Sequence, residues 1–272
     1  MLKKILNKFL KKSDKGQEVQ VEPEKILYQS SNRLKGKNAI IIGGGKGIGK
    51  AIATRFAEEG AKIIINSRSK TDLENVKKEI QNNKGECSCF VGDITDLKTI
   101  QNLFLESKSR LGKLDILINC AGTVDFGSIE SFPLNKFEKI MDLNVKSVFS
   151  CIQEAIKMMK SDGDEGKIIT IGSIASKWTG RGGDGSYSAS KYAVYGMIES
   201  IARQLHGSGS NIAVGLICPG VVDTTLTNPD KDQKPNWMRP TTIADSVLHM
   251  VTAPKNVNIF DLTIFGMDEK PW

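Results

Sequence analysis

Beyond residue 37, short apolar segments alternate with longer amphipathic segments in a regular order. The apolar segments are rich in isoleucine and valine, which is typical of buried strands. We expect strands at 38–42, 62–66, 87–91, 116–119, 167–171, 212–217 and 257–264. Apolar residues at helical spacing begin near Gly47, Thr71, Leu97, Pro133, Ser186 and Thr241.

Apolar strands separated by helices indicate a parallel sheet covered on both faces, because right-handed βαβ crossovers join parallel neighbours compactly. The predicted fold class is α/β, with a doubly wound, parallel, seven-stranded sheet of the Rossmann type. We assign residues 37–272 to this single domain and residues 1–36 to a basic N-terminal extension and linker. Sheets of this kind bind ligands at the carboxyl ends of their strands.

Residues 1–12, MLKKILNKFLKK, place apolar side chains on one helical face and lysines on the other. This pattern predicts a short basic amphipathic helix. One interpretation is weak contact with a membrane surface. The alternative, a frayed or self-docking extension, is favoured because so short a segment buries little area. No apolar run approaches the roughly 18 residues of a membrane span, and we expect no secretory signal.

The net charge of +7 would by itself suggest a nucleic-acid or membrane partner. Residues 1–37 hold ten basic and four acidic residues, so they carry +6 and leave +1 for the rest. We therefore expect no nucleic-acid partner. The five cysteines and two histidines show no metal-ligand spacing, so we expect no metal. A cytoplasmic location fits these cysteines, peripheral at the membrane if residues 1–12 contact lipid.

A glycine-rich segment at residues 43–49, GGGKGIG, joins the first predicted strand to the first predicted helix. Glycines let the backbone turn sharply and approach a pyrophosphate, whose charge is stabilised by the N–H groups at the start of the helix. A glycine-rich string alone is weak evidence, but here it lies between strand and helix, as a dinucleotide site requires.

The end of the second predicted strand distinguishes between the two nicotinamide dinucleotides. An NAD site usually has an acidic residue there to accept from the ribose hydroxyl. This chain has Arg68 instead, with no carboxylate before Asp72. Arg68 and Lys46 offer charge to a 2′-phosphate, so the sequence favours NADP(H) over NAD(H). The alternative is that both cations are solvated surface side chains.

Tyr187 and Lys191 lie one turn apart at the start of a predicted helix and therefore share a face. A cation held beside a phenol stabilises the phenolate, which lets a tyrosine transfer protons near neutral pH. Tyr192 and Tyr195 have no lysine at this spacing. Tyr187 is thus the tyrosine that the pattern marks for acid–base chemistry.

These motifs together resemble the short-chain dehydrogenase/reductase family, in its branch with TGxxxGxG and YxxxK motifs. The resemblance covers residues 37 to about 265. The chain departs from the family pattern at Ile42, where threonine is usual, and at Cys120, where the NNAG motif has a second asparagine. Together with the charged Lys46 and Arg68, the matching family residues imply cofactor contacts from Gly43, Gly45, Lys46, Gly47, Ile48, Gly49, Arg68, Asp93, Ile94, Asn119, Ala121, Gly122, Tyr187, Lys191, Pro219, Gly220, Val222 and Thr224.

The resemblance also implies four catalytic residues, Asn144, Ser173, Tyr187 and Lys191. Ser173 would hydrogen-bond the substrate oxygen, and Tyr187 would transfer its proton. Lys191 would stabilise the phenolate and bind the nicotinamide ribose. Asn144 would hold a water that connects Lys191 to solvent, or would be a buried structural amide. Asp93 would contact the adenine, or would only form a turn.

The function implied is hydride transfer between NADP(H) and a carbonyl or secondary alcohol, with a ketone or 3-oxoacyl group as the expected substrate type. Two alternatives stay open, a catalytically silent NADPH sensor and a membrane-recruited interaction protein on the same fold. Residues 177–185 and 225–240 flank the expected substrate position. Family members are usually dimers or tetramers, so we expect a homo-oligomer, and we expect Trp272 to pack on another subunit or near a cleft.

Overall fold

The computed structural model describes residues 32–179, 183–228 and 236–269. Seven strands form one sheet in which every neighbouring pair is parallel. The strands are β1 (Asn38–Ile42), β2 (Lys62–Ser67), β3 (Glu86–Val91), β4 (Ile116–Asn119), β5 (Glu165–Ile171), β6 (Asn211–Pro219) and β7 (Asp261–Ile264).

The strand order is β3-β2-β1-β4-β5-β6-β7, so the chain winds outward first in one direction from β1 and then in the other from β4. The reversal lies between β1 and β4, where Ile42 pairs with Asn119. Loops that leave the carboxyl ends of these two strands diverge, and the crevice between them is where doubly wound sheets bind ligands.

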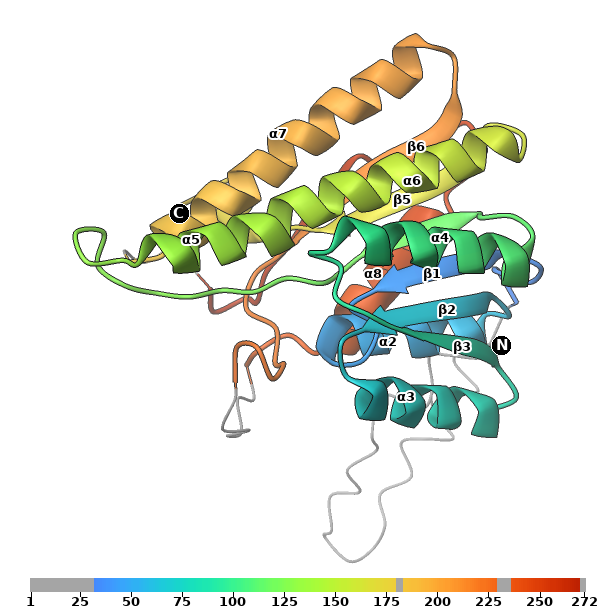
Figure 1. Cartoon of the computed structure of the whole chain (residues 1–272), viewed down its shortest axis with the longest axis horizontal. Helices are drawn as coiled ribbons and strands as arrows, with labels where there is room; N and C mark the ends of the chain where they lie inside the picture. Colours follow the sequence, from blue (N-terminus) through green and yellow to red (C-terminus); the bar gives the residue numbers. More distant parts are fainter. Residues whose placement is uncertain (1–31, 180–182, 229–235, 270–272) are drawn as a thin grey trace, which may run out of the picture. The chain divides into compact units, whose positions relative to one another are not determined.

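Helices cover both faces of the sheet (Figure 1). They are α2 (Gly47–Glu58), α3 (Lys70–Asn82), α4 (Leu97–Leu111), α5 (Leu134–Met141), α6 (Ser147–Ser161), α7 (Gly185–Gly207) and α8 (Pro240–Val251). Side chains of β1 alternate between the two faces: Ile41 packs in the core with α2, α3 and α8, whereas Ile40 and Ile42 pack in the core with α4, α6 and α7. The double burial explains why the strands are apolar without alternation.

The predicted fold class is confirmed, with one strand shorter than expected. The seventh strand was predicted from residue 257 but begins at Asp261. The N–H of Val257 closes a turn onto the Pro254 carbonyl, and the side chain of Asn258 donates to the Val214 carbonyl. These bonds hold residues 257 and 258 outside the sheet ladder although their composition suits a strand.

Residues just before β1 pack against the end of α2. Leu34 is buried, and its N–H donates to the Glu59 carbonyl oxygen. The Glu59 carboxylate, fully buried, lies 2.7 Å from Arg33 and 3.0 Å from Arg55, and Arg55 also contacts Asp245 of α8. Two guanidinium groups therefore compensate a carboxylate that would be costly to bury alone.

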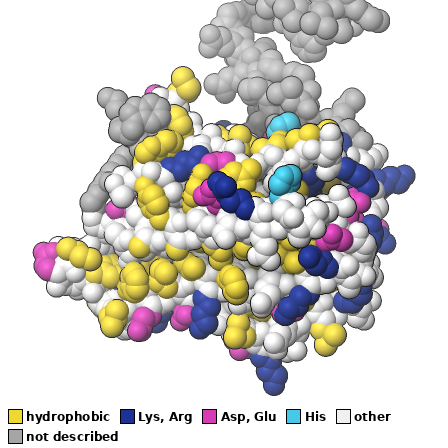
Figure 2. Space-filling model, turned by 90° about the horizontal axis from the view of Figure 1, so that it is seen from above, with side chains coloured by type: hydrophobic (Ala, Val, Ile, Leu, Met, Phe, Trp, Pro, Cys, Tyr) yellow, Lys and Arg dark blue, Asp and Glu magenta, His cyan; other side chains and the backbone are white. Residues whose placement is uncertain are grey.

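Charged side chains of both signs are interspersed on the face drawn in Figure 2. This agrees with the charge near zero of the chain beyond residue 37. Among the described helices, none is long and apolar enough to cross a membrane. Within the described ranges, no group of three or more His, Cys, Asp or Glu side chains is arranged to hold a metal ion.

Candidate active site

A cleft of about 660 Å³ opens at the carboxyl ends of the strands, at the reversal between β1 and β4. It extends from the glycine-rich loop to the N-terminal turns of α7. The predicted residues that line it are Gly43, Gly45, Lys46, Gly47, Ile48, Arg68, Asp93, Ile94, Ala121, Gly122, Ser173, Tyr187, Lys191, Pro219, Gly220, Val222 and Thr224. Segments far apart in sequence thus meet in one cavity.

The glycine-rich loop has the geometry needed to approach a diphosphate. Gly43 and Gly47 have φ angles of +80° and +52°, which side chains rarely adopt. A Cβ on Gly43 would lie 2.6 Å from the Ala121 nitrogen, so the loop touches the segment after β4. Lys46 occupies the N-cap in an extended conformation, and its side chain makes no capping hydrogen bond to α2. The first N–H groups of α2 are therefore suited to an anion such as the pyrophosphate of a dinucleotide.

Charged side chains of both signs line the cleft near the end of β2. Lys46 Nζ lies 3.0 Å from Asp72 Oδ2, and Arg68 Nη1 lies 3.8 Å from Asp93 Oδ2. Hydrogen bonding to Ser69 and the charge of Lys46 lower the pKa of Asp72, so this carboxyl group is ionised at neutral pH. Asp72, the first carboxylate after Arg68, lies in the first turn of α3, which brings it into the cleft.

Asp93 lines the cleft and also forms a turn. Its Oδ1 accepts from the N–H and the hydroxyl of Thr95, at 3.0 Å and 2.8 Å. The turn-forming alternative is therefore present in the structure. Asp93 Oδ2 lies 3.8 Å from Arg68 Nη1, and contact of Asp93 with an adenine stays a prediction.

Tyr187 and Lys191 meet at the other end of the cleft. Lys191 is buried, and its Nζ donates to the Ile171 carbonyl oxygen at 3.1 Å. The same nitrogen lies 5.6 Å from the centre of the Tyr187 ring. The end of β5 thus holds the ammonium group of Lys191 beside the Tyr187 ring.

Ser173 follows β5 by two residues and lines the same end of the cleft. It caps the short 3-10 helix Ile174–Ser176, because its Oγ accepts from the Ala175 N–H at 3.1 Å. A hydroxyl oxygen that accepts in this way keeps its own hydrogen for another partner. The neighbouring serines differ: Ser176 bonds back to the Ser173 N–H, and Ser186 lines a different surface.

Asn144 lies in a π-helical turn, Asp142–Lys146, between α5 and α6. Its Oδ1 accepts from the Thr123 N–H at 2.9 Å, and its Nδ2 donates to the Thr123 carbonyl oxygen at 2.9 Å and to Ser190 Oγ at 3.0 Å. Asn144 is therefore a buried structural amide, as the second of its two interpretations predicts. An added Cβ on Gly122 would lie 3.4 Å from Asn144 Oδ1 and 3.9 Å from Lys191 Nζ, so both groups approach the same glycine.

Three predicted residues lie behind the cleft lining. Gly49 is packed under the loop, where a Cβ would lie under 3.0 Å from the Gly43 carbonyl oxygen. Asn119, the last residue of β4, is buried, and its Nδ2 donates to Thr170 Oγ1 at 3.4 Å. Asn144 is buried by the bonds described above. These residues support the walls of the cleft.

Four further residues of the lining, Cys120, Thr225, Leu226 and Thr227, lie in the motif after β4 and in the 225–240 segment that the sequence places beside the substrate. Sequence reasoning missed the rest of the lining: Asn66, Ser67, Ser69, Asp72, Gly92, Thr123, Leu143, Ile171 and Gly172. One signal was available, since Ser69 and Asp72 have the spacing of a helix N-terminal capping pair. Cys120 lines the cleft without nucleophilic character, because burial raises the pKa of its thiol to about 12. The predictions on residues 1–12 and on Trp272 lie outside the described residues and stay predictions.

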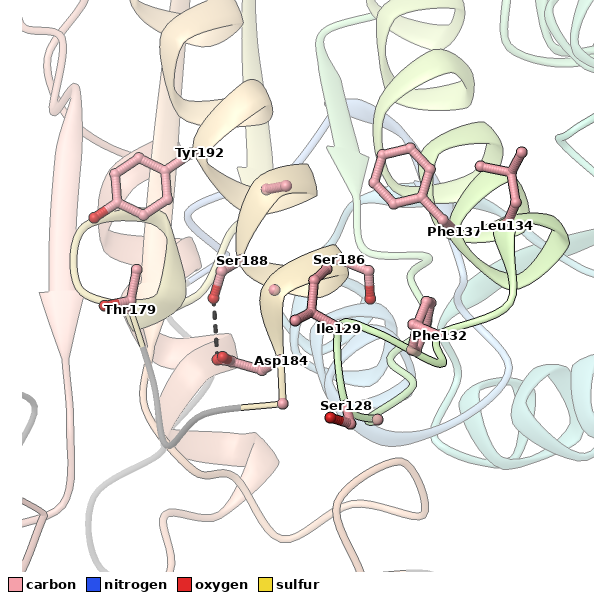
Figure 3. A pocket seen from close by; sticks show the side chains of 14 residues that line it. Ser128, Ile129, Phe132, Leu134, Phe137, Thr179, Asp184, Ser186, Ser188 and Tyr192 are labelled. Carbon is pink, nitrogen blue, oxygen red and sulfur yellow. Dashed lines mark hydrogen bonds between the residues drawn. The ribbon is translucent and has the colours of Figure 1, made fainter.

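A groove of about 1020 Å³ lies beside α7 and is separate from this cleft (Figure 3). Its lining includes Ile129, Leu134 and Tyr192, and Ser188 Oγ donates to Asp184 Oδ2 at 3.0 Å at its edge. Ser186, Ser188, Ala189 and Tyr192 of α7 face this groove, whereas Tyr187 and Lys191 face the cleft. Helix α7 therefore separates the groove from the cleft.

Known proteins of similar sequence match most of the chain. The sequence profile described as short chain dehydrogenase matches residues 37–235. An uncharacterized oxidoreductase of Staphylococcus aureus is 32% identical over 234 residues, which cover 85% of this chain and 97% of the relative. An uncharacterized oxidoreductase of Staphylococcus saprophyticus is 29% identical over 232 residues, with the same coverage of 85% and 97%.

Solved structures are similar over the same region. A variant of a Serratia marcescens short-chain dehydrogenase/reductase has a TM-score of 0.79 and 31% identity, covering 86% of this chain and 98% of that one. A Burkholderia cenocepacia short chain dehydrogenase, solved in complex with NADP, has a TM-score of 0.76 and 29% identity, with coverage of 86% and 98%. With its parallel sheet, glycine loop and Tyr187–Lys191 pair, the chain belongs to the short-chain dehydrogenase/reductase family and is an oxidoreductase of that family.

Proposed function

We propose that this oxidoreductase uses NADP(H) to reduce a ketone or 3-oxoacyl-type carbonyl to a secondary alcohol. The observation that carries the proposal is the position of Lys191 Nζ, fixed 3.1 Å from the Ile171 carbonyl and 5.6 Å from the Tyr187 ring centre. This pair lines the same cleft as the glycine-rich N-terminus of α2. One cavity thus offers an anion site and a proton donor.

NADPH bound in the cleft would supply a hydride from its dihydronicotinamide C–H bond to the carbonyl carbon and would be left as NADP+. Tyr187 would give its hydroxyl proton to the carbonyl oxygen, so the C=O π bond is replaced by a C–H bond and an O–H bond. Ser173 donates its hydroxyl hydrogen to the same oxygen as negative charge develops there. Lys191 stabilises the Tyr187 phenolate that remains. A proton from solvent then restores Tyr187, and Asn144 keeps the Thr123 loop in place beside Lys191.

Support for NADP(H) over NAD(H) comes from Lys46 and Arg68, the two cations at the end of the cleft where the second strand finishes. A 2′-phosphate accepts charge-assisted hydrogen bonds from such groups. The Burkholderia cenocepacia relative in complex with NADP points the same way. A preference for NADP(H) also favours reduction as the direction in the cell.

The test is oxidation of NADPH, followed by absorbance, with a panel of ketones, 3-oxoacyl thioesters and keto sugars. Tyr187→Phe removes the proposed proton donor and should lower kcat by at least about a hundredfold without abolishing NADPH binding. Tyr195→Phe is the matched control, because Tyr195 lies on the same helix and lines neither the cleft nor the groove beside α7. Undiminished activity of Tyr187→Phe would refute the proposed proton donor.

The same experiment separates the enzyme from a silent NADPH sensor. A sensor would bind NADPH and turn over no member of the panel. All four side chains of the proposed mechanism are present, and Ser173, Tyr187 and Lys191 line the cleft, which favours turnover. Sedimentation with anionic liposomes, with and without residues 1–12, tests the third possibility of membrane recruitment, and we expect a cytoplasmic enzyme with at most weak lipid binding.

We propose that a second copy of the chain covers the groove beside α7. Leu134 and Ile129 are 69% and 85% exposed there, and a contiguous apolar groove is typical of an interface. Light scattering should give a dimer or tetramer, and Leu134→Asp should shift it toward the monomer. Leu105→Asp, on the exposed face of α4 away from this groove, is the control. A monomeric wild-type protein would contradict the proposal.

A further inference from the structure

The turn that follows β6 forms one wall of the cleft through Pro219, Gly220 and Val222. Its backbone is bonded to the C-terminal segment of the chain. The Gly220 N–H donates to the Ile264 carbonyl oxygen at 2.7 Å, which continues the pairing of β6 with β7. The Val221 N–H donates to Glu269 Oε1 at 2.8 Å, a side-chain acceptor 48 residues away.

The other carboxylate oxygen of Glu269 holds the C-terminal segment itself. Glu269 Oε2 accepts from the Gly266 N–H at 2.7 Å. One carboxylate therefore joins the wall of the cleft to the chain after β7 by two charge-assisted hydrogen bonds, which are stronger than neutral ones.

Gly220 is shaped to fit this carboxylate. An added Cβ would lie under 3.0 Å from both oxygens of Glu269, a separation that real Cβ atoms essentially never show. Because the Glu269 oxygens are held by two N–H groups, they cannot move aside without losing those bonds. A side chain at position 220 would therefore displace the Glu269 carboxylate and break its two hydrogen bonds.

We propose that Glu269 is a positioning residue that fixes the turn 219–222 as a wall of the cofactor site. The inference rests on the proposed function, because it assumes that a dinucleotide binds against this turn. Glu269 acts through the main chain of Val221 and touches no reacting atom. Without it, the wall samples more conformations in the empty cleft, and binding has to order them.

The rest of the turn has its own support, so loss of Glu269 should act locally. Val222 pairs with Met238 in a parallel bridge, and the Asp223 N–H donates to the Met238 carbonyl oxygen at 2.8 Å. The hydroxyl of Thr227 donates to the Val222 carbonyl oxygen. These bonds keep the chain folded on the far side of Val221, and we expect a defect in cofactor binding rather than in folding.

The first experiment compares Glu269→Gln with Asp268→Asn, a neighbouring exposed carboxylate, in the full chain. The glutamine side chain accepts one N–H but presents an NH₂ donor to the other. NADPH affinity, measured by fluorescence titration, and the KM for NADPH should weaken on the order of tenfold in Glu269→Gln, the effect of losing one charge-assisted bond. The urea midpoint and the kcat at saturating NADPH should change much less, and Asp268→Asn should match wild type.

A second experiment is a double-mutant cycle with Gly220→Ala and Glu269→Ala. The added methyl group displaces the carboxylate, so each single variant should lose a similar NADPH affinity. The double variant should be no weaker than Gly220→Ala alone, because the methyl group then occupies the space that the carboxylate leaves. Strict additivity of the two losses would overturn the inference.

The outcomes separate this inference from the proposed function. If wild-type protein binds no NADPH, the proposed function fails and the inference fails with it. If wild-type protein binds NADPH but Glu269→Gln equals Asp268→Asn, only the inference is overturned. If Glu269→Gln lowers the free energy of unfolding in urea by as much as it lowers the free energy of NADPH binding, Glu269 has a structural role. That result would also overturn the inference.

Discussion

Lys46 Nζ and Asp72 Oδ2 lie 3.0 Å apart, so the lysine of the glycine-rich loop is paired with a carboxylate in the first turn of α3. The pair lies in the cleft, at the end where the second strand finishes. Lys46 is 60% exposed and Asp72 is 23% exposed, so Lys46 remains accessible to a ligand. A 2′-phosphate that binds Lys46 would compete with Asp72 and would be repelled by it.

Replacing Asp72 by asparagine should therefore raise the preference for NADP(H) over NAD(H). Removal of one like charge near the phosphate should strengthen NADPH binding by roughly threefold to tenfold and leave NADH binding nearly unchanged. Fluorescence titration with both dinucleotides at low and high salt measures this, and the gain should shrink at high salt. Glu74→Gln, on the same helix outside the cleft lining, is the control. Weaker NADH binding in Asp72→Asn would instead make Asp72 the acceptor for the ribose hydroxyl.

Asn144 should matter for both stability and turnover. Its amide makes three hydrogen bonds in a buried position, two of them to the backbone of Thr123. Asn144→Ala leaves those groups unpaired, and the free energy of unfolding should fall by roughly 1–3 kcal/mol. Ser190→Ala removes only one of the three partners and should cost less. Urea denaturation and NADPH oxidation measure the two effects, and a stable, fully active Asn144→Ala would contradict this account.

Asp115 should give the protein part of its stability at neutral pH. Burial would raise the pKa of this carboxyl group, but hydrogen bonds from Lys113 and the Asn38 N–H, with Lys37 nearby, hold the pKa below its usual value. A lowered pKa in the folded state adds stability above the unfolded pKa, about 3.9, and this stability is lost as the pH falls through the folded pKa. Asp115→Asn should therefore cost about 1–3 kcal/mol at pH 7 and progressively less below about pH 4. If the difference in the free energy of unfolding between wild type and Asp115→Asn stays constant with pH, the role assigned to Asp115 is wrong.

Much of the fold was predictable because its signals are local. Buried parallel strands are apolar throughout, so the isoleucine-rich segments of β1, β2 and β4 could be located from composition alone. The glycine-rich loop and the Tyr187–Lys191 spacing are likewise local patterns, and both lie in the cleft. The seventh strand was placed too early because Val257 and Asn258 have strand-like neighbours but bond to a turn and to β6.

The rest of the site depends on contacts that sequence spacing does not encode. Asp72 reaches Lys46 only because the first turn of α3 returns toward the glycine loop. Glu269 reaches Val221 across 48 residues, through the pairing of β6 with β7. The π-helical turn that carries Asn144 has no composition signal, since Asp142–Lys146 continues the helical pattern on either side.

Gly49 and Gly196 offer a matched pair of glycine-to-alanine changes inside helices. A Cβ on Gly49 would lie under 3.0 Å from the Gly43 carbonyl oxygen, which is backbone and cannot yield cheaply. Gly49→Ala should therefore displace the glycine loop, weaken NADPH binding by at least about tenfold and lower stability by roughly 1–3 kcal/mol. Gly196, in α7, has nothing within 4 Å of an added Cβ, so Gly196→Ala should stabilise the protein by about 0.5–1 kcal/mol and leave NADPH binding unchanged. Urea denaturation and NADPH titration of both variants test the comparison, and normal NADPH affinity in Gly49→Ala would show that the loop does not need this close contact.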